Sequence, residues 1–409
     1  MNGVRPRLLS LNSYHYRRGG SDVVYLDHDA LFRDRGWETA VMSMHHPKNI
    51  ASRWSQYFVD ELEFGQTKGL VDKFVKASKV VYSFEAQRRL RCLLQVFPAD
   101  IAHLHCIYHH LSPSVLPILH EEGIPAVLTA HDLKIACPAY KMLNRTGICE
   151  RCKEGSLLNV VKYRCVRDSL GASAVVAVES ALHRHLDTYR RYLGRVIAPS
   201  QFYRSKLLEW GWSPDKLAYI PNYVDSNLFE PAYHAGDYVL FAGRLAPEKG
   251  VATLIRAAAA SGARLRVAGT GPLEAELRAM PDASGVEWLG FCAGDALWQQ
   301  VRGARALILP SEWYENAPMS ILEAYACGKP VLGANIGGIP ELIRDDTGWI
   351  FRSADESDLA DRLRRVFDTP ASTIAEMGRQ GRLFVEAEFN RDRYFGGVQS
   401  VYRELGVKC

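Results

Sequence analysis

Short apolar runs alternate along the chain with stretches of helical periodicity, and this alternation predicts a protein of parallel β-strands and α-helices. Apolar runs of about four to eight residues are typical of strands buried on both faces. In the first half they lie at 7–13, 38–44, 100–106, 126–130, 195–199 and 218–221, and in the second half at 238–243, 265–268, 286–289, 306–309 and 330–334. Helical patterns separate most of them, notably at 71–96 and 166–193. The order predicts an α/β protein with two doubly wound parallel sheets.

The predicted sheets divide the chain into domains. A polar, irregular stretch that ends at Asp237 predicts the linker between them. We expect an N-terminal domain at 1–222, a C-terminal domain at 223–388 and a last helix at 389–409. Residues 133–193 depart from the strand–helix alternation and predict a helical insertion that contains cysteines.

Composition and charge narrow the class of protein. The chain has 409 residues and a formal net charge of +4, which is too small an excess to predict a nucleic-acid partner. No apolar run approaches the roughly 18 residues of a transmembrane helix, and the N-terminus lacks the apolar core of a signal peptide. We therefore expect a cytoplasmic protein with reduced cysteines. Arg88, Arg89 and Arg91 form either a solvated helix face or one that meets anionic lipid, which would make the protein peripheral on the inner face of the membrane.

The most informative stretch runs from Leu307 to Leu342, where a buried strand, a polar loop and a helix follow one another. Glu315 lies in the loop, and Glu323 lies eight residues later in the helix that Pro318 begins. Free backbone N–H groups at a helix start bind anions, so the loop predicts a binding site at Asn316, Ala317, Pro318, Met319 and Ser320. Glu323 has two oxygens that suit the adjacent hydroxyls of a ribose. The alternative is a solvent-exposed Glu315 and a surface Glu323.

Arg244 and Lys249 follow the first strand of the second domain. Two cations at the ligand-binding edge of such a sheet predict a diphosphate site. Two solvated loop cations are the alternative.

Three features of the first domain concern a ligand. Gly19-Gly20 follow the first strand, where backbone approaches phosphate or sugar in such folds, and His131 ends a central strand. Asp27-His28-Asp29 has the D-x-D form of metal-dependent sugar transferases, but it lies within a predicted helix. We interpret it as helix surface.

Cys137, Cys149, Cys152 and Cys165 have the spacing C-x11-C-x2-C-x12-C. In a reducing compartment this pattern predicts a structural zinc site with four thiolates. Four unrelated residues or a disulfide pair are the alternatives.

The segments GRLAPEKG (243–250) and GKPVLGANIGGIPELI (328–343), with Glu315 and Glu323 between them, resemble the retaining family-4 glycosyltransferases of the GT-B fold. The resemblance covers essentially the whole second domain. In the first domain it rests on Gly19-Gly20, His131-Asp132 and Asn222-Tyr223-Val224-Asp225, where the family usually has Gly in place of Tyr223.

This resemblance implies two Rossmann-like domains that face each other across a cleft, with the last helix crossing back to the first domain. It implies that Arg244 and Lys249 stabilise the departing diphosphate, that Glu323 holds the ribose, and that Glu315 and the amides of 316–320 meet the donor sugar and phosphate. Gly19-Gly20 would approach the diphosphate and His131 the transferred sugar. The family needs no metal cofactor for catalysis, and retention implies displacement on one face of the sugar.

We therefore expect a retaining hexosyltransferase in surface polysaccharide biosynthesis. Its donor would be a nucleotide-diphosphate sugar, UDP-linked by family prevalence or GDP-mannose, and its acceptor a glycan or a lipid-linked hydroxyl. A sugar-nucleotide epimerase or a phosphorylase on the same fold is one alternative, although the insertion argues against an epimerase. An inactive carbohydrate-binding scaffold is the other, and the intact Arg244, Lys249, Glu315 and Glu323 argue against it.

Overall fold

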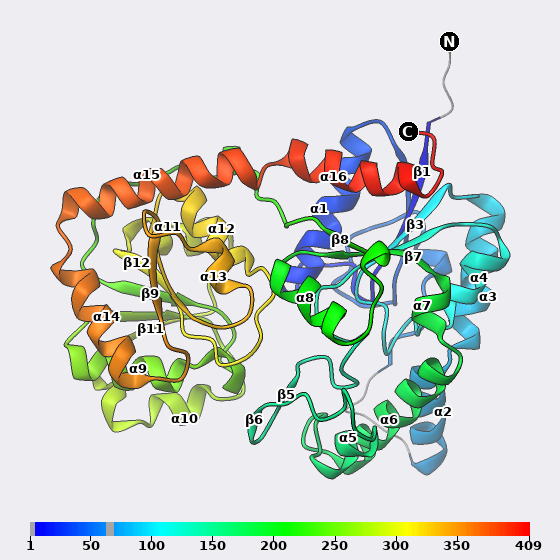
Figure 1. Cartoon of the computed structure of the whole chain (residues 1–409), viewed down its shortest axis with the longest axis horizontal. Helices are drawn as coiled ribbons and strands as arrows, with labels where there is room; N and C mark the ends of the chain where they lie inside the picture. The colour runs from blue at the N-terminus through cyan, green and yellow to red at the C-terminus, as the bar shows by residue number, and fades with distance from the viewer. Residues whose placement is uncertain (1–4, 63–68) are drawn as a thin grey trace. The chain divides into compact units, whose positions relative to one another are not determined.

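The computed structural model describes residues 5–62 and 69–409, which form two compact units (Figure 1). The first unit comprises Met1–Ile220 and Phe395–Cys409, and the second comprises Pro221–Tyr394. The sequence-based division placed the first boundary after residue 222 and assigned 389–394 to the last helix. In the structure, residues 221–222 and 389–394 belong to the second unit.

A parallel sheet of six strands forms the centre of the first unit, in the order β2-β1-β3-β4-β7-β8. Strand β1 pairs in parallel with both β2 and β3, so the strand order reverses between β1 and β3. In doubly wound sheets ligands bind at the carboxyl ends of the strands beside such a reversal. The strands are β1 (Arg7–Leu11), β2 (Glu38–Met42), β3 (Ile101–Leu104), β4 (Ala126–Thr129), β7 (Leu193–Ala198) and β8 (Leu217–Tyr219).

Helices of the first unit include the predicted ones, but two of the predicted stretches are each divided into two helices. The helix expected at 71–96 is two helices, because the chain leaves the first at Tyr82, and Ser83 caps the second by accepting the Ala86 N–H at 3.1 Å. The helix expected at 166–193 is also two helices, at 170–185 and 188–192, because the chain passes through Asp187 with a positive φ of +48° between them. The helices are α1 (Gly20–Asp34), α2 (Leu70–Val81), α3 (Phe84–Val96), α4 (Val115–Glu121), α5 (Leu158–Lys162), α6 (Leu170–His185), α7 (Thr188–Tyr192) and α8 (Gln201–Glu209), together with the part of α16 (Arg391–Glu404) from Phe395 onward.

The second unit contains another parallel sheet of six strands, in the order β11-β10-β9-β12-β13-β14, which reverses between β9 and β12. Strand β14 (Gly348–Phe351) was not predicted, and it extends the sheet by pairing with β13. The other strands are β9 (Val239–Ala242), β10 (Leu265–Ala268), β11 (Val286–Gly290), β12 (Ala306–Leu309) and β13 (Val331–Ala334). The helices are α9 (Val251–Ser261), α10 (Glu274–Arg278), α11 (Gly294–Gly303), α12 (Met319–Ala326), α13 (Ile339–Leu342), α14 (Glu356–Asp368) and α15 (Ala371–Glu388).

Burial on both faces explains the continuous apolar runs of the second sheet. Phe241 and Ile308 pack into the core on one face, and Leu240 and Leu307 pack into the core on the other. The core also corrects one prediction. The stretch interpreted as a linker packs onto this sheet, since Val224 and Phe229 are buried in its core.

A helix must be both long and apolar to cross a membrane. Within residues 5–62 and 69–409, no helix is both long enough and apolar enough to cross a bilayer.

Candidate functional site

The candidate site residues of the second unit lie where its strand order reverses. The loop after β9 carries Arg244 and Lys249, and the loop after β12 carries Glu315. Because the carboxyl ends of parallel strands share one edge of the sheet, these distant segments meet.

Lys249 and Glu315 form an ion pair across the two loops. Lys249 Nζ lies 2.6 Å from Glu315 Oε1, and the Ser311 hydroxyl donates to the same oxygen at 2.8 Å. Glu315 is only 6% exposed, so the alternative of a solvent-exposed Glu315 is wrong. Burial alone would raise the pKa of Glu315, but the charge of Lys249 and these hydrogen bonds lower it below its usual value. The carboxylate is therefore ionised and holds the ammonium group of Lys249 in place.

Arg244 is the second cation of this edge. Its guanidinium pairs with the buried carboxylate of Glu248, four residues along the same loop. The Arg244 side chain is 59% exposed, so one side of the guanidinium remains accessible to an anion. A buried carboxylate therefore orients each cation of the edge. Glu248 of the same loop orients Arg244, and Glu315 of the adjacent loop orients Lys249.

Two glycines allow these loops to approach each other closely. Gly250 has φ +64°, and a Cβ atom there would lie 1.9 Å from the Pro310 carbonyl oxygen. Gly337 has φ +61°, and its Cβ would lie 2.3 Å from the Glu315 carbonyl oxygen. That oxygen accepts a hydrogen bond from the Gly338 N–H at 2.9 Å. Glycine at these positions therefore sets the loop positions of Lys249 and Glu315.

Helix α12 begins beside this pair. Pro318 is its N-cap residue and Met319 its first residue, so residues 316–320 surround the helix start as predicted. The Ala317 carbonyl accepts a hydrogen bond from Asn222 Nδ2 at 3.3 Å, which ties the loop to the start of the second unit. Glu323 is partly exposed in the second turn of α12.

In the first unit, Asn12 joins the three segments at the strand reversal. Its side chain accepts the Cys106 N–H at 3.0 Å after β3 and donates to Asp22 at 2.9 Å in the first turn of α1. Gly19 is the exposed N-cap of α1, with Gly20 as the first helical residue. A Cβ on Gly19 would meet no protein atom within 4 Å. Internal packing therefore does not require glycine at position 19, and the space in front of it is open to a ligand.

His131 follows β4, at the same edge of the sheet. Its Nε2 lies 2.8 Å from Nδ1 of His105, a residue that follows β3. Burial lowers the pKa of His131 to about 4, so its ring is neutral near pH 7. One of the two rings must donate in this hydrogen bond, so the tautomers of the two neutral rings are coupled: one ring carries its proton on the shared nitrogen and the other carries it on the opposite nitrogen.

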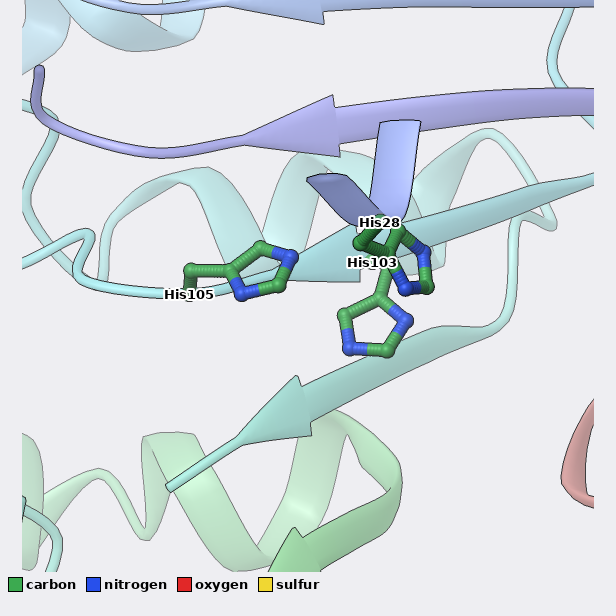
Figure 2. A group of neighbouring side chains, drawn as sticks. All are labelled: His28, His103 and His105. Carbon is green, nitrogen blue, oxygen red and sulfur yellow. The ribbon is translucent and has the colours of Figure 1, made fainter. Parts of the chain in front are cut away.

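His105 also belongs to a buried group with His28 and His103 (Figure 2). One nitrogen from each of the three rings lies within 4.8 Å of the others. His105 Nε2 is buried without a hydrogen-bond partner. Both nitrogens of His103 are engaged, however, since Nδ1 lies 2.5 Å from the Tyr402 hydroxyl and Nε2 lies 2.7 Å from the Thr129 hydroxyl. Tyr402 also reaches His28 Nε2 at 3.2 Å. We interpret the group as a neutral hydrogen-bonded core rather than a metal site.

The Asp27-His28-Asp29 segment was predicted to be helix surface, and this is wrong for two of its residues. His28 and Asp29 are buried, and Asp29 accepts hydrogen bonds from Ser10 and Thr39 and pairs with Arg33. The sequence alone does not reveal this burial, because the residues are polar and the partners of Asp29 lie on β1 (Ser10) and β2 (Thr39). Asp27 is partly exposed and pairs with an arginine.

Asp132 is a site candidate to which the sequence analysis gave no role of its own. Its carboxylate accepts hydrogen bonds from the Tyr108 hydroxyl and from the Lys134 N–H, the latter at 2.9 Å. Burial raises the pKa of Asp132 to about 6. The signal was its place directly after His131 at a strand end.

All four cysteines of the predicted zinc site are unpaired thiols in the segment after β4. The sulfurs do not form a group within 4.8 Å of one another, a criterion that only the histidine group meets among the described residues. Zinc binding therefore stays a prediction.

Comparisons with known proteins agree on one family. A family model described as "Glycosyltransferase Family 4" matches residues 18–228, and one described as "Glycosyl transferases group 1" matches residues 229–384. The first model alone covers about half of the chain.

Two curated relatives illustrate the range of the similarity. A GDP-mannose-dependent monoacylated alpha-(1-6)-phosphatidylinositol monomannoside mannosyltransferase of Corynebacterium glutamicum is 32% identical over 160 residues, which cover 36% of this chain and 42% of that protein. A putative colanic acid biosynthesis glycosyltransferase, WcaL of Escherichia coli, is 26% identical over 252 residues, 56% of this chain and 60% of that protein. The chain thus spans about half the length of the curated relatives it matches.

Solved structures show the same fold over the whole chain. The Anabaena protein HepE, in complex with UDP and glucose, superposes with a TM-score of 0.67 at 16% identity and covers 98% of this chain and 100% of its own. At this identity the likeness concerns the fold alone.

Proposed function

Since the chain belongs to glycosyltransferase family 4 and has the GT-B fold, we propose that it transfers a sugar from a nucleotide-diphosphate donor to a hydroxyl group. The observation that carries this proposal is the arrangement of Arg244 and Lys249 at the strand reversal of the second unit. Each cation is held by a buried carboxylate, and Arg244 keeps an accessible side. Fixed cations of this kind stabilise the negative charge that develops on a departing diphosphate.

The donor nucleotide is the next part of the proposal. A UDP-sugar is favoured, because the structurally similar HepE was solved with UDP and glucose. GDP-mannose is the second candidate, because the Corynebacterium relative is a GDP-mannose-dependent mannosyltransferase. In either case we assign the ribose to Glu323, and the sugar and phosphate to the amides of residues 316–320. The Glu315 side chain already binds Lys249, so its role is to position that cation as well as to face the donor.

In the first unit we assign the transferred sugar to His131 and the diphosphate to Gly19 and Gly20. A neutral imidazole exchanges hydrogen bonds with a sugar hydroxyl without attracting the phosphate. The pKa of about 4 for His131 keeps the ring in that state. The open space before Gly19 allows the backbone to approach an oxygen.

We propose transfer with retention at the anomeric carbon. The bond from this carbon to the β-phosphate oxygen breaks as the acceptor oxygen attacks on the same face, and the departing phosphate takes the acceptor proton. Arg244 and Lys249 then bind the charge that the phosphate gains. We assign no catalytic step to a metal ion.

For the acceptor we propose a glycan or a lipid-linked hydroxyl in surface polysaccharide biosynthesis, reached from a membrane surface. Helix α6 packs against α2 and α5, and these helices expose large apolar side chains. Phe74 is 76% exposed and Leu158 is 71% exposed, with Val178 and Leu170 also exposed. Exposed Lys73 and Lys162 accompany them, and apolar side chains beside cations suit an anionic lipid surface.

We propose this surface, rather than the helix face with Arg88, Arg89 and Arg91, as the one that meets the membrane. On that helix face, Arg89 donates to the Gln56 carbonyl and Arg91 pairs with Glu121. Sedimentation with phosphatidylglycerol vesicles should carry the protein down, and Phe74→Ser should reduce the bound fraction. Equal binding to phosphatidylcholine, or no effect of the substitution, would contradict the membrane assignment.

A thermal-shift screen tests the donor assignment. A ligand at 100 times its dissociation constant stabilises a protein by about 2.7 kcal/mol. UDP or GDP should therefore raise the melting temperature selectively, and a matching nucleotide sugar should add to the effect. Absence of a shift with every nucleotide would count against the transferase and favour the inactive scaffold.

A further inference from the structure

We propose that Cys137, Cys149, Cys152 and Cys165 bind one zinc ion through four thiolates. The proposal is independent of the donor and of the reaction. It rests on the surroundings of the four sulfurs in the segment that follows β4.

The first observation is that each sulfur faces N–H groups. Cys137 Sγ faces the backbone N–H groups of Ala139 and Met142, and Cys152 Sγ faces that of Val160. Arg151 Nη1 lies 3.4 Å from Cys149 Sγ. Hydrogen-bond donors around a sulfur favour the thiolate over the thiol, and such donors accompany metal-bound ligands.

Cys165 adds an unsatisfied donor to this set. The Asn144 side-chain amide is directed at the Cys165 sulfur, yet its Nδ2 atom is buried without a hydrogen bond of normal geometry. A buried donor that lacks a partner is costly. A charged thiolate at Cys165 would supply the acceptor.

The second observation is that the four cysteines are neighbours in space, although no three of their sulfurs lie within 4.8 Å of one another. Cys165 is close enough to interact with both Cys149 and Cys152, and Cys137 with both Cys152 and Cys165. Zinc ligation removes thiol protons, and the side chains would have to draw together to reach one ion.

Charge around the cysteines also fits an anionic metal site. A zinc ion with four thiolates carries a net charge of −2. Arg184 interacts with Cys152 and Cys137, and its guanidinium donates to the Ala136 carbonyl at 2.9 Å. Arg151 contacts Cys149. Two arginines thus offset the charge that four thiolates would bring.

The segment with the four cysteines has little regular secondary structure, so a bound metal would help to hold its backbone. It contains only the short hairpin of β5 (Leu143–Asn144) and β6 (Gly147–Ile148) and the single turn of α5. Tyr140, Met142 and Arg164 have positive φ angles. Segments with so little regular structure are typically held by metals or disulfides.

The place of the segment suggests its purpose. It begins directly after His131 and Asp132, and a buried ion pair at 2.5 Å between Lys134 and Glu179 joins its first turn to α6. Helix α5 of this segment lies beside α6 in Figure 1 and packs against it. The metal would therefore fix the chain that leaves the His131 strand end.

Metal analysis of the full-length protein tests the proposal without any assay of activity. We expect about one zinc per chain, released when a mercurial reagent titrates the thiols. Cys149→Ser and Cys152→Ser should lose the metal, whereas Cys92→Ser, at an exposed cysteine on α3, should retain it. Cobalt substitution should give a thiolate-to-cobalt charge-transfer band in the wild type.

Three results would overturn the proposal, and none depends on whether a variant folds. One is wild-type protein free of zinc, with all four thiols rapidly alkylated in the native state. Another is a disulfide among the four cysteines in non-reducing mass spectrometry of protein prepared under reducing conditions. The third is iron in place of zinc.

Discussion

The two units have the same kind of sheet but different chemistry at its edge. Twelve of the thirteen histidines lie in the first unit, and only the exposed His234 lies in the second. The edge of the second sheet carries ion pairs, in which Lys249 and Arg244 each pair with a buried carboxylate. The edge of the first sheet carries neutral imidazoles, such as that of His131, which is hydrogen-bonded to His105.

The difference indicates a division of labour between the two edges. Cations suit a phosphate, whose charge changes during reaction, whereas neutral rings suit sugar hydroxyls, whose charge does not. The surroundings at each edge also determine the charge state of the side chains there. The charge of Lys249 keeps Glu315 ionised, and burial keeps His131 neutral.

The largest expected effect concerns the charged edge. Lys249→Ala should lower kcat by about 10²- to 10³-fold, because it removes a fixed charge that acts on the leaving group. His131→Ala, which removes a neutral hydrogen-bonding group, should cost about tenfold. Steady-state transfer rates measured with the donor identified by the nucleotide screen compare the two, with circular dichroism to verify folding. A near-normal rate for Lys249→Ala, or equal losses in both variants, would break the comparison.

The next effect concerns stability in acid. Burial holds the pKa of five histidines of the first unit far below the ordinary value of about 6.5, at about 4 for His15, His110 and His131 and about 3 for His28 and His109. The unfolded chain therefore binds more protons between about pH 3 and 6.5, so stability is full above pH 6.5 and falls as the pH is lowered through this window. Three buried carboxyls of the first unit oppose this trend, because burial raises the pKa of Asp132 to about 6 and also raises the pKa values of Asp22 and Asp29.

Each such histidine contributes up to about 1.4 kcal/mol per pH unit. The first unit should therefore lose its folded structure on acidification to about pH 5, while the second unit remains folded. Calorimetric scans from pH 8 to 5 would show one transition moving to lower temperature and one nearly constant. Parallel movement of both transitions would show that the histidines do not distinguish the units.

A smaller effect concerns the glycines that position the charged edge. Gly250 and Gly262 have nearly equal positive φ angles, +64° and +71°, but only Gly250 meets another atom at a Cβ position. Gly262→Ala should cost about 1–2 kcal/mol of unfolding free energy for the left-handed backbone. Gly250→Ala should cost about 1–3 kcal/mol more from the clash with Pro310. Denaturant unfolding of both variants measures the difference, and equal costs would refute the close approach of the loops.

The charged edge could be predicted from the sequence because its signals are local. In the sequence, the strand at 306–309 is followed directly by the loop with Glu315 and by the helix that Pro318 begins. The strand at 238–243 is likewise followed directly by the loop with Arg244 and Lys249. The strand ends and the site residues can therefore be identified together. The burial of Glu315 could not be predicted in this way. It depends on Lys249 and Ser311, and the first of these lies 66 residues away.

The neutral edge was less accessible for the same reason. His131 was identified by its place at a strand end, but its partner His105 and the Tyr108 partner of Asp132 come from the neighbouring strand end. Strand order alone reveals such pairs, and no short pattern encodes it. The break at Ser83 also escaped, because the helical periodicity continues on both sides of the cap.

The most direct test of the division of labour is calorimetric titration of UDP and a UDP-sugar, or their GDP counterparts, into the wild type, Lys249→Ala and His131→Ala. The account predicts that Lys249→Ala weakens the free nucleotide and the nucleotide sugar alike, by about 10- to 100-fold. It predicts that His131→Ala binds the free nucleotide normally and weakens only the nucleotide sugar. Normal nucleotide binding by Lys249→Ala, with weakened nucleotide binding by His131→Ala, would contradict the assignment of the diphosphate to the charged edge.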